Sequence, residues 1–134
     1  MKVAAIADTH TTLWYAFADA RLSGAAKLAI EQAAAEGQYI GVSAISLAEV
    51  VYLAEKGRIA PDALGRLLAV CHDPAKVLVE VAVDTTIVQR MPAVPRAEVP
   101  DLPDRIIAAT ALALHVPVIT RDNRIRLAAL ETIW

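Results

Sequence analysis

Short apolar runs alternate with longer segments of helical periodicity along the whole chain. The strand-like runs are "VAAIA", "YIGVS", "KVLVEVAV", "PVIT" and, at the end, "ETIW". The segments between them repeat apolar residues at the spacing of a helix face. Strands that alternate with helices predict an α/β fold, a three-layer α/β/α sandwich on a mostly parallel sheet. No repeat or linker divides the chain, so we expect a single domain over residues 1–134.

Capping residues help to delimit the predicted helices. Ser23, Ser43 and Asp84 each precede a helical segment and are good N-cap residues, while Gly37 and Gly57 follow one and predict its end. The predicted helices cover residues 9–17, 25–36, 44–56, 61–72, 85–91 and 104–116. A proline-rich loop over residues 92–103 precedes the last of these helices.

Composition excludes several classes of protein. The chain is 57% hydrophobic, but no stretch approaches the ~20 apolar residues of a membrane-spanning helix. There is no convincing secretion signal, and the single cysteine, Cys71, cannot form an internal disulfide. We therefore expect a cytoplasmic protein that is not membrane-bound. The net charge of −2 is not that of a strongly basic nucleic-acid-binding domain, although the last third of the chain is rich in arginine.

Carboxylates follow the predicted strands at positions that matter for ligand binding. Asp8 and Asp122 come directly after strand-like runs, and Asp104 opens the helix that leads to the second of these runs. In open parallel sheets, ligands bind beyond the carboxyl ends of the strands. Glu49 has apolar helix neighbours, and a carboxylate in such a setting is costly unless it is paired or bound to a metal. These four acids are the candidate site.

Three of these acids also have a simpler explanation, and Glu49 is the hardest to explain without a ligand. Asp8 could cap the helix that follows it, and Asp122 could be a turn residue before Asn123. Asp104 could be the third residue of a capping box that Asp101 opens. His10, next to Asp8, could be structural or could point into the same cleft. The metal-site hypothesis is favoured because four separate explanations of this kind would otherwise be needed in one chain.

Oxygen ligands with little nitrogen or sulfur suit Mg²⁺ or Mn²⁺, and such a site favours phosphoryl transfer. Arg105 and Arg121 are next to two of the acids and could hold a phosphate backbone, although solvent-exposed helix faces also carry such arginines. The chain has no glycine-rich dinucleotide fingerprint, no phosphate-binding loop and no zinc-like spacing of histidines with its cysteine.

Four segments in this order resemble PIN-domain ribonucleases of the VapC toxin type: "IADTHTTLW", "VSAISLAEV", "DLPDRIIAATALAL" and "VITRD". The resemblance implies a Mg²⁺- or Mn²⁺-dependent endoribonuclease that cleaves RNA, is neutralised by a cognate antitoxin and commonly forms a homodimer. It also implies that the catalytic, metal-binding acids are Asp8, Glu49, Asp104 and Asp122. Asp101 matches an acid often found there, and Thr120 matches a small polar residue near the site. Ala48 departs from the bulky aromatic that often precedes the glutamate, which affects local packing more than the ligand set.

Other functions remain open on the sequence alone. A nuclease of the same fold could act in RNA processing outside a toxin pair, and a catalytically inert interaction module could share the fold. A phosphoacceptor signalling domain also clusters acids at strand ends, but it expects a lysine after the final strands, where this chain has only arginines.

Overall fold

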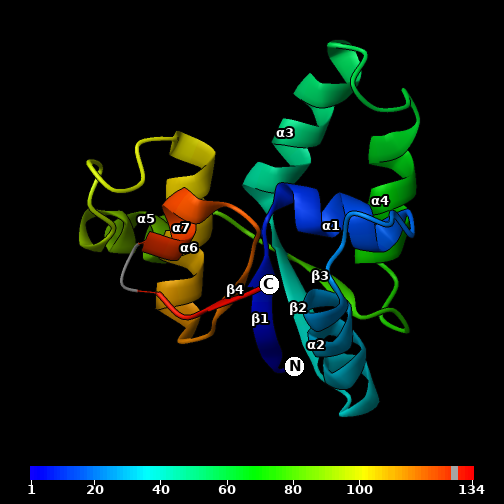
Figure 1. Ribbon diagram of the computed structural model, residues 1–134, viewed down its shortest axis with the longest axis horizontal. Coiled ribbons are helices and arrows are strands. Elements are labelled where there is room, and N and C mark those ends of the chain that lie inside the picture. Colours follow the sequence, from blue (N-terminus) through cyan, green and yellow to red (C-terminus); the bar gives the residue numbers. More distant parts are fainter. Residues whose placement is uncertain (128–129) are drawn as a thin grey trace.

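The computed structural model describes residues 1–127 and 130–134, and in this part of the chain five parallel strands form one sheet (Figure 1). The order across the sheet is β3-β2-β1-β4-β5. The strands are β1 (Val3–Ala7), β2 (Tyr39–Ser43), β3 (Leu78–Val81), β4 (Val118–Ile119) and β5 (Thr132–Ile133). The predicted α/β sandwich is confirmed, with a sheet that is parallel throughout.

Helices cover both faces of this sheet (Figure 1). The first face carries α1 (Thr9–Ala16), α2 (Gly24–Ala35), α3 (Ala44–Glu55) and α4 (Ala63–Cys71). The second face carries α5 (Thr85–Arg90), the short 3-10 helix η1 (Met91–Ala93), α6 (Leu102–Leu114) and α7 (Asn123–Leu127). In the described residues, no helix combines the length and the apolar character needed to cross a bilayer.

The order of the strands creates a switch point at the centre of the sheet. From β1 the chain adds β2 and β3 on one side, and it then crosses to the other side to add β4 and β5. The carboxyl ends of β1 and β4 therefore lie side by side where the direction of winding reverses, and Ala7 pairs there with Ile119. This is the position at which doubly wound sheets bind their ligands.

The core follows the two-residue alternation of the strands. In β1, Ala5 and Ala7 contribute to the apolar cluster under α1–α4, whereas Ile6 contributes to the cluster under α5 and α6. All three side chains are at most 3% exposed. The strand thus packs against apolar side chains on both faces of the sheet. A polar side chain can therefore be accommodated only at the end of the strand.

Three local features differ from the predicted elements. The strand expected over residues 76–83 is shorter, Leu78–Val81, and lies at the edge of the sheet. The helix expected from residue 104 begins at Leu102, because Asp101 is its N-cap and accepts a hydrogen bond from the amide of Asp104 at 3.0 Å. The short helix α7 was not predicted at all. It begins one residue after Asp122, whose carboxylate accepts a hydrogen bond from the amide of Arg124.

Candidate active site

Asp8 both ends a strand and caps a helix. Its Oδ1 accepts the amide hydrogen of Thr11 at 2.9 Å, which caps α1. Its Oδ2 accepts the hydroxyl hydrogen of Thr120, the residue after β4, at 2.5 Å. The side chain is buried, with the residue 8% exposed. The simpler explanation of Asp8 is therefore correct, and it does not exclude a ligand role, because the carboxylate is fixed at the switch point between β1 and β4.

Glu49 is held in place from α1. The hydroxyl of Thr9 donates a hydrogen bond to Glu49 Oε1 and is itself hydrogen-bonded to the hydroxyl of Ser46 at 2.9 Å. Burial raises the pKa of Glu49 above its ordinary value, the Thr9 hydrogen bond opposes that rise, and the charge of Asp101 adds to it. The surroundings of Glu49 are less apolar than its sequence neighbours suggested, because Tyr52 is 65% exposed.

Three acids approach from the other side of the switch point. Asp101 caps α6, Asp104 lies in its first turn, and Asp122 follows β4. Burial raises the pKa of Asp104 to about 7, helped by the charges of Asp101 and Asp122 and by a hydrogen bond to Asp122 that favours the protonated form. A carboxyl with so high a pKa takes on negative charge reluctantly, and a cation nearby would reverse that preference.

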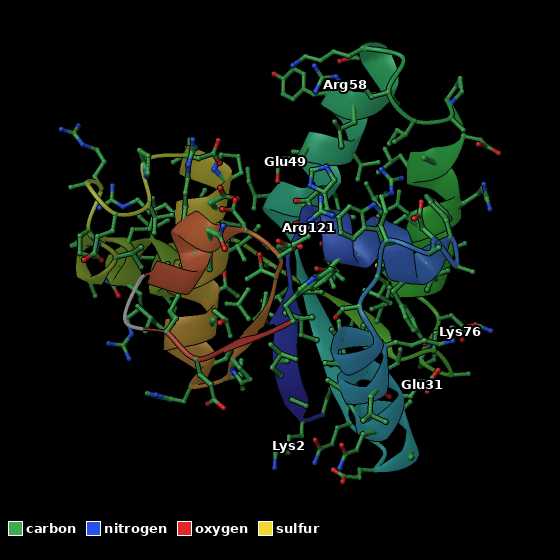
Figure 2. All side chains as sticks on the ribbon, viewed as in Figure 1. Lys2, Glu31, Glu49, Arg58, Lys76 and Arg121 are labelled. Atoms are coloured by element: carbon green, nitrogen blue, oxygen red, sulfur yellow. The ribbon has the colours of Figure 1, made fainter. Side chains whose placement is uncertain are left out.

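A cavity of about 480 Å³ brings these groups together. All four predicted metal-binding acids line it, and so does Asp101. The full lining consists of Asp8, Thr9, His10, Trp14, Arg21, Glu49, Asp101, Asp104, Arg121 and Asp122. In Figure 2 the labelled side chains of Glu49 and Arg121 lie near the junction of β1 and α1.

The chemistry of this lining fits a divalent metal ion. Carboxylate and hydroxyl oxygens are the donors that Mg²⁺ and Mn²⁺ prefer. The crowding that raises the pKa of Asp104 is the electrostatic condition that a cation would relieve. In residues 1–127 and 130–134, however, no three histidine, cysteine, aspartate or glutamate side chains converge closely enough to enclose one ion. The donor set fits by its chemistry, and ligation would require the side chains to move closer together.

The two arginines expected beside the acids have different positions. Arg121 lines the cavity, and its guanidinium lies 4.7 Å from the centre of the Trp14 ring. Arg105 is turned away from the cavity and donates hydrogen bonds to the carbonyls of Val94 at 2.9 Å and Met91 at 3.1 Å. It therefore fixes the loop before α6, and the structure does not bring it to the acids.

Several residues in or behind the lining of the cavity were not identified as site residues from the sequence. Thr9 orients Glu49, and Ser46 supports Thr9 from behind. A signal was available, because Thr9 follows Asp8 and Ser46 lies one helical turn before Glu49. Arg21 comes from the connection between α1 and α2, and nothing in the sequence placed it at this cavity. His10 does face the cleft, which was one of its two expected positions.

Comparison with known proteins decides the family. The sequence model of the PIN domain family matches residues 5–130 of the chain. The chain belongs to the PIN domain family. Ribonuclease VapC22 of Mycobacterium tuberculosis is 35% identical to this PIN domain over 121 residues, which covers 89% of the chain and 87% of the relative. The predicted resemblance to VapC-type proteins is confirmed.

Solved structures agree on the PIN fold. The crystal structure of VapBC2 from Rickettsia felis bound to a DNA fragment from their promoter matches with a TM-score of 0.71 at 16% identity, and the match covers 97% of each chain. A toxin–antitoxin complex from Klebsiella pneumoniae matches with a TM-score of 0.67 at 25% identity, over 98% of this chain and 97% of that one.

Proposed function

We propose that this PIN domain is a Mg²⁺- or Mn²⁺-dependent endoribonuclease that acts in the cytoplasm as the toxin of a toxin–antitoxin pair. The observation that carries the proposal is the acid-lined cavity at the switch point between β1 and β4. A similar protein named as a ribonuclease and a matching toxin–antitoxin complex support the same function. An inert interaction module would have no use for five carboxylates in one cavity, since their mutual repulsion costs stability.

Asp8, Glu49, Asp104 and Asp122 are the residues that would hold the metal. When bound, a divalent ion would supply the Lewis acid that activates water and neutralises charge on the scissile phosphate. Thr120 holds the Asp8 carboxylate, while Thr9, itself hydrogen-bonded to Ser46, holds that of Glu49. These hydroxyls restrict the acids to fixed orientations, as the partners of metal ligands commonly do.

RNA cleavage by the purified protein should require Mg²⁺ or Mn²⁺. The protein is incubated with a pool of cellular RNAs, and the cut ends are mapped by sequencing. We expect discrete cuts with millimolar metal, loss of cutting in excess EDTA and recovery when metal is restored. The reason is that carboxylate oxygens, without a bound metal ion, supply no Lewis acid to activate water. Full activity in excess EDTA would refute the metal mechanism.

An antitoxin should inhibit by covering the acidic cavity with a basic side chain, since carboxylates that attract a cation also attract a guanidinium. The candidate antitoxin is a small DNA-binding protein encoded by an adjoining gene. In the experiment, this protein is purified and mixed with the purified PIN domain. We expect it to stop RNA cleavage and to prevent Mn²⁺ binding. A complex that still binds Mn²⁺ like the free protein would contradict this mode of inhibition, and absence of such a gene would favour a role in RNA processing.

We also propose a homodimer in solution, as the resemblance to VapC-type proteins implies. Light scattering of the purified protein measures its mass directly, and a monomer at every concentration would refute this part of the proposal.

A further inference from the structure

The acidic cavity presents an electrostatic problem for an RNA-cleaving enzyme. Its five carboxylates repel the phosphates of a substrate, and among the described residues that line it the cationic side chains are Arg21 and Arg121. Cations at fixed positions attract the backbone and set its register without reading sequence. These two arginines are therefore the lining groups that can attract the phosphates of a substrate.

Arg21 is held by two neighbours in a defined orientation. Its Nε and Nη2 donate hydrogen bonds to the two carboxylate oxygens of Asp19, at 3.0 and 2.7 Å. Its guanidinium also lies over the ring of Trp14, 5.2 Å from the centre. Two of the five guanidinium N–H groups are thus engaged, and the end formed by Nη1 and the outer hydrogen of Nη2 keeps a pair of donors for a phosphate.

Trp14 joins Arg21 to Arg121. The indole is 5% exposed and packs 5.8 Å from the ring of Trp134 and 5.6 Å from that of His10. Both guanidiniums lie within 5.2 Å of its ring, although one comes from the connection after α1 and the other from the segment after β4. A buried aromatic ring thus fixes two arginines from distant parts of the sequence at the lining of the cavity.

We propose that Arg21 and Arg121 form a phosphate clamp that binds the RNA backbone beside the acidic cavity, with Trp14 and Asp19 as positioning residues. This inference rests on the proposed ribonuclease function and assigns the side from which the substrate enters. It predicts that removal of either guanidinium weakens RNA binding, whether or not a metal is present.

Arg66 provides a matched control. Its guanidinium is also stacked on an aromatic ring, 4.5 Å from the centre of Phe17, and it is exposed. It lines an adjoining cavity of about 530 Å³, which Arg21 and Trp14 also line, and it is not among the lining residues of the acidic cavity. Arg66→Gln removes the same charge and the same kind of contact next to the proposed clamp, and it leaves the contacts of Arg21 and Arg121 with Trp14 in place.

The experiment measures binding of a fluorescein-labelled single-stranded RNA of mixed sequence by anisotropy, in EDTA and in Ca²⁺, over a range of salt concentrations. We expect Arg21→Gln and Arg121→Gln each to weaken binding about three- to tenfold at low salt. Each should also reduce the slope of log affinity against log salt by about 0.7, the value for one lost phosphate contact on a single strand. Arg66→Gln should leave both quantities unchanged.

Asp19→Asn tests the positioning role. This change makes the protein more positive, so charge alone would tighten RNA binding, whereas loss of the bidentate contact that orients Arg21 would weaken it. We expect weaker binding with an unchanged salt slope. Tighter binding would overturn the assignment of Asp19.

Three results would overturn the clamp: unchanged affinity and slope in both arginine variants, an equal loss in Arg66→Gln, or no RNA binding by the parent in either condition. Failure of the proposed function gives a different result. A parent that binds RNA through these arginines but cleaves none in Mg²⁺ would support the clamp and refute the ribonuclease.

Discussion

Asp8→Asn is expected to lower the rate of RNA cleavage by at least about 100-fold with little change in stability. Asparagine keeps an oxygen that can accept the Thr11 amide hydrogen, and it caps helices as well as aspartate does. Its amide can still hydrogen-bond to the hydroxyl of Thr120, which can act as an acceptor. The change therefore removes a negative charge from the cavity and leaves the local structure in place. Cleavage of a reporter RNA in Mg²⁺ and a thermal melt measure the two effects.

Asp84→Asn is the matched control for this prediction. Asp84 caps α5 by accepting the amide hydrogen of Ile87, as Asp8 does for α1, but it lies outside the acidic cavity. We expect the control variant to cleave RNA at the parental rate. If Asp8→Asn retained full activity, or if Asp84→Asn lost as much, the assignment of Asp8 to the catalytic site would be wrong.

Asp104→Asn should raise the melting temperature of the metal-free protein at pH 8. Charged Asp104 is half-buried among other acids, and its presence there costs roughly 2 kcal/mol after solvent screening is allowed for. Loss of a charge in the first turn of α6 costs up to about 1 kcal/mol in the opposite direction. The net gain of about 1 kcal/mol corresponds to a rise of about 3–5 °C for a chain of this size. Calorimetry in EDTA measures it.

The pH dependence of this difference follows from the raised pKa. Folded Asp104 has a pKa of about 7, whereas the unfolded value is near 4, so the folded state binds the proton more tightly. The loss of stability caused by the charged Asp104 carboxylate is fully present above pH 7 and is relieved as the pH falls from 7 towards 4. We therefore expect the advantage of Asp104→Asn to shrink steadily between pH 8 and pH 4.

Asp62→Asn separates this effect from the loss of a negative charge at any helix N-terminus. Asp62 stands at the start of α4, is exposed, and makes no side-chain capping hydrogen bond. Its replacement should leave the melting temperature the same or slightly lower at every pH. Added Mg²⁺ or Mn²⁺ should stabilise the parent and Asp62→Asn more than Asp104→Asn, because binding to the native state alone adds stability. An Asp104→Asn variant that melts lower in EDTA and responds fully to metal would show that Asp104 is only a helix residue.

Most of the fold could be predicted from the sequence because local signals agreed with the tertiary structure. Ser23 and Ser43 cap α2 and α3 through their hydroxyls, as expected. The apolar runs became buried parallel strands, since strands covered on both faces carry nearly continuous apolar sequence. Helix α7 was missed because its five residues are too few to show a helical period.

The site was only partly predictable. Carboxylates at strand ends could be grouped, because parallel strands place their carboxyl ends on one edge. The roles of the arginines could not, because a long side chain can turn toward the cavity or away from it at the same sequence position. Arg105 turned toward backbone carbonyls of its own loop, whereas Arg21, remote in sequence from every acid except Asp19, reached the cavity over Trp14.

Titration of the metal-free protein with Mn²⁺ by isothermal calorimetry tests the central claim most directly, namely that the acid-lined cavity between β1 and β4 is a divalent-metal site. We expect saturable binding by the parent and by Asp84→Asn, and binding weakened by at least about tenfold in both Asp8→Asn and Asp104→Asn. Equal Mn²⁺ affinity in all four proteins, or no binding by the parent, would contradict this claim.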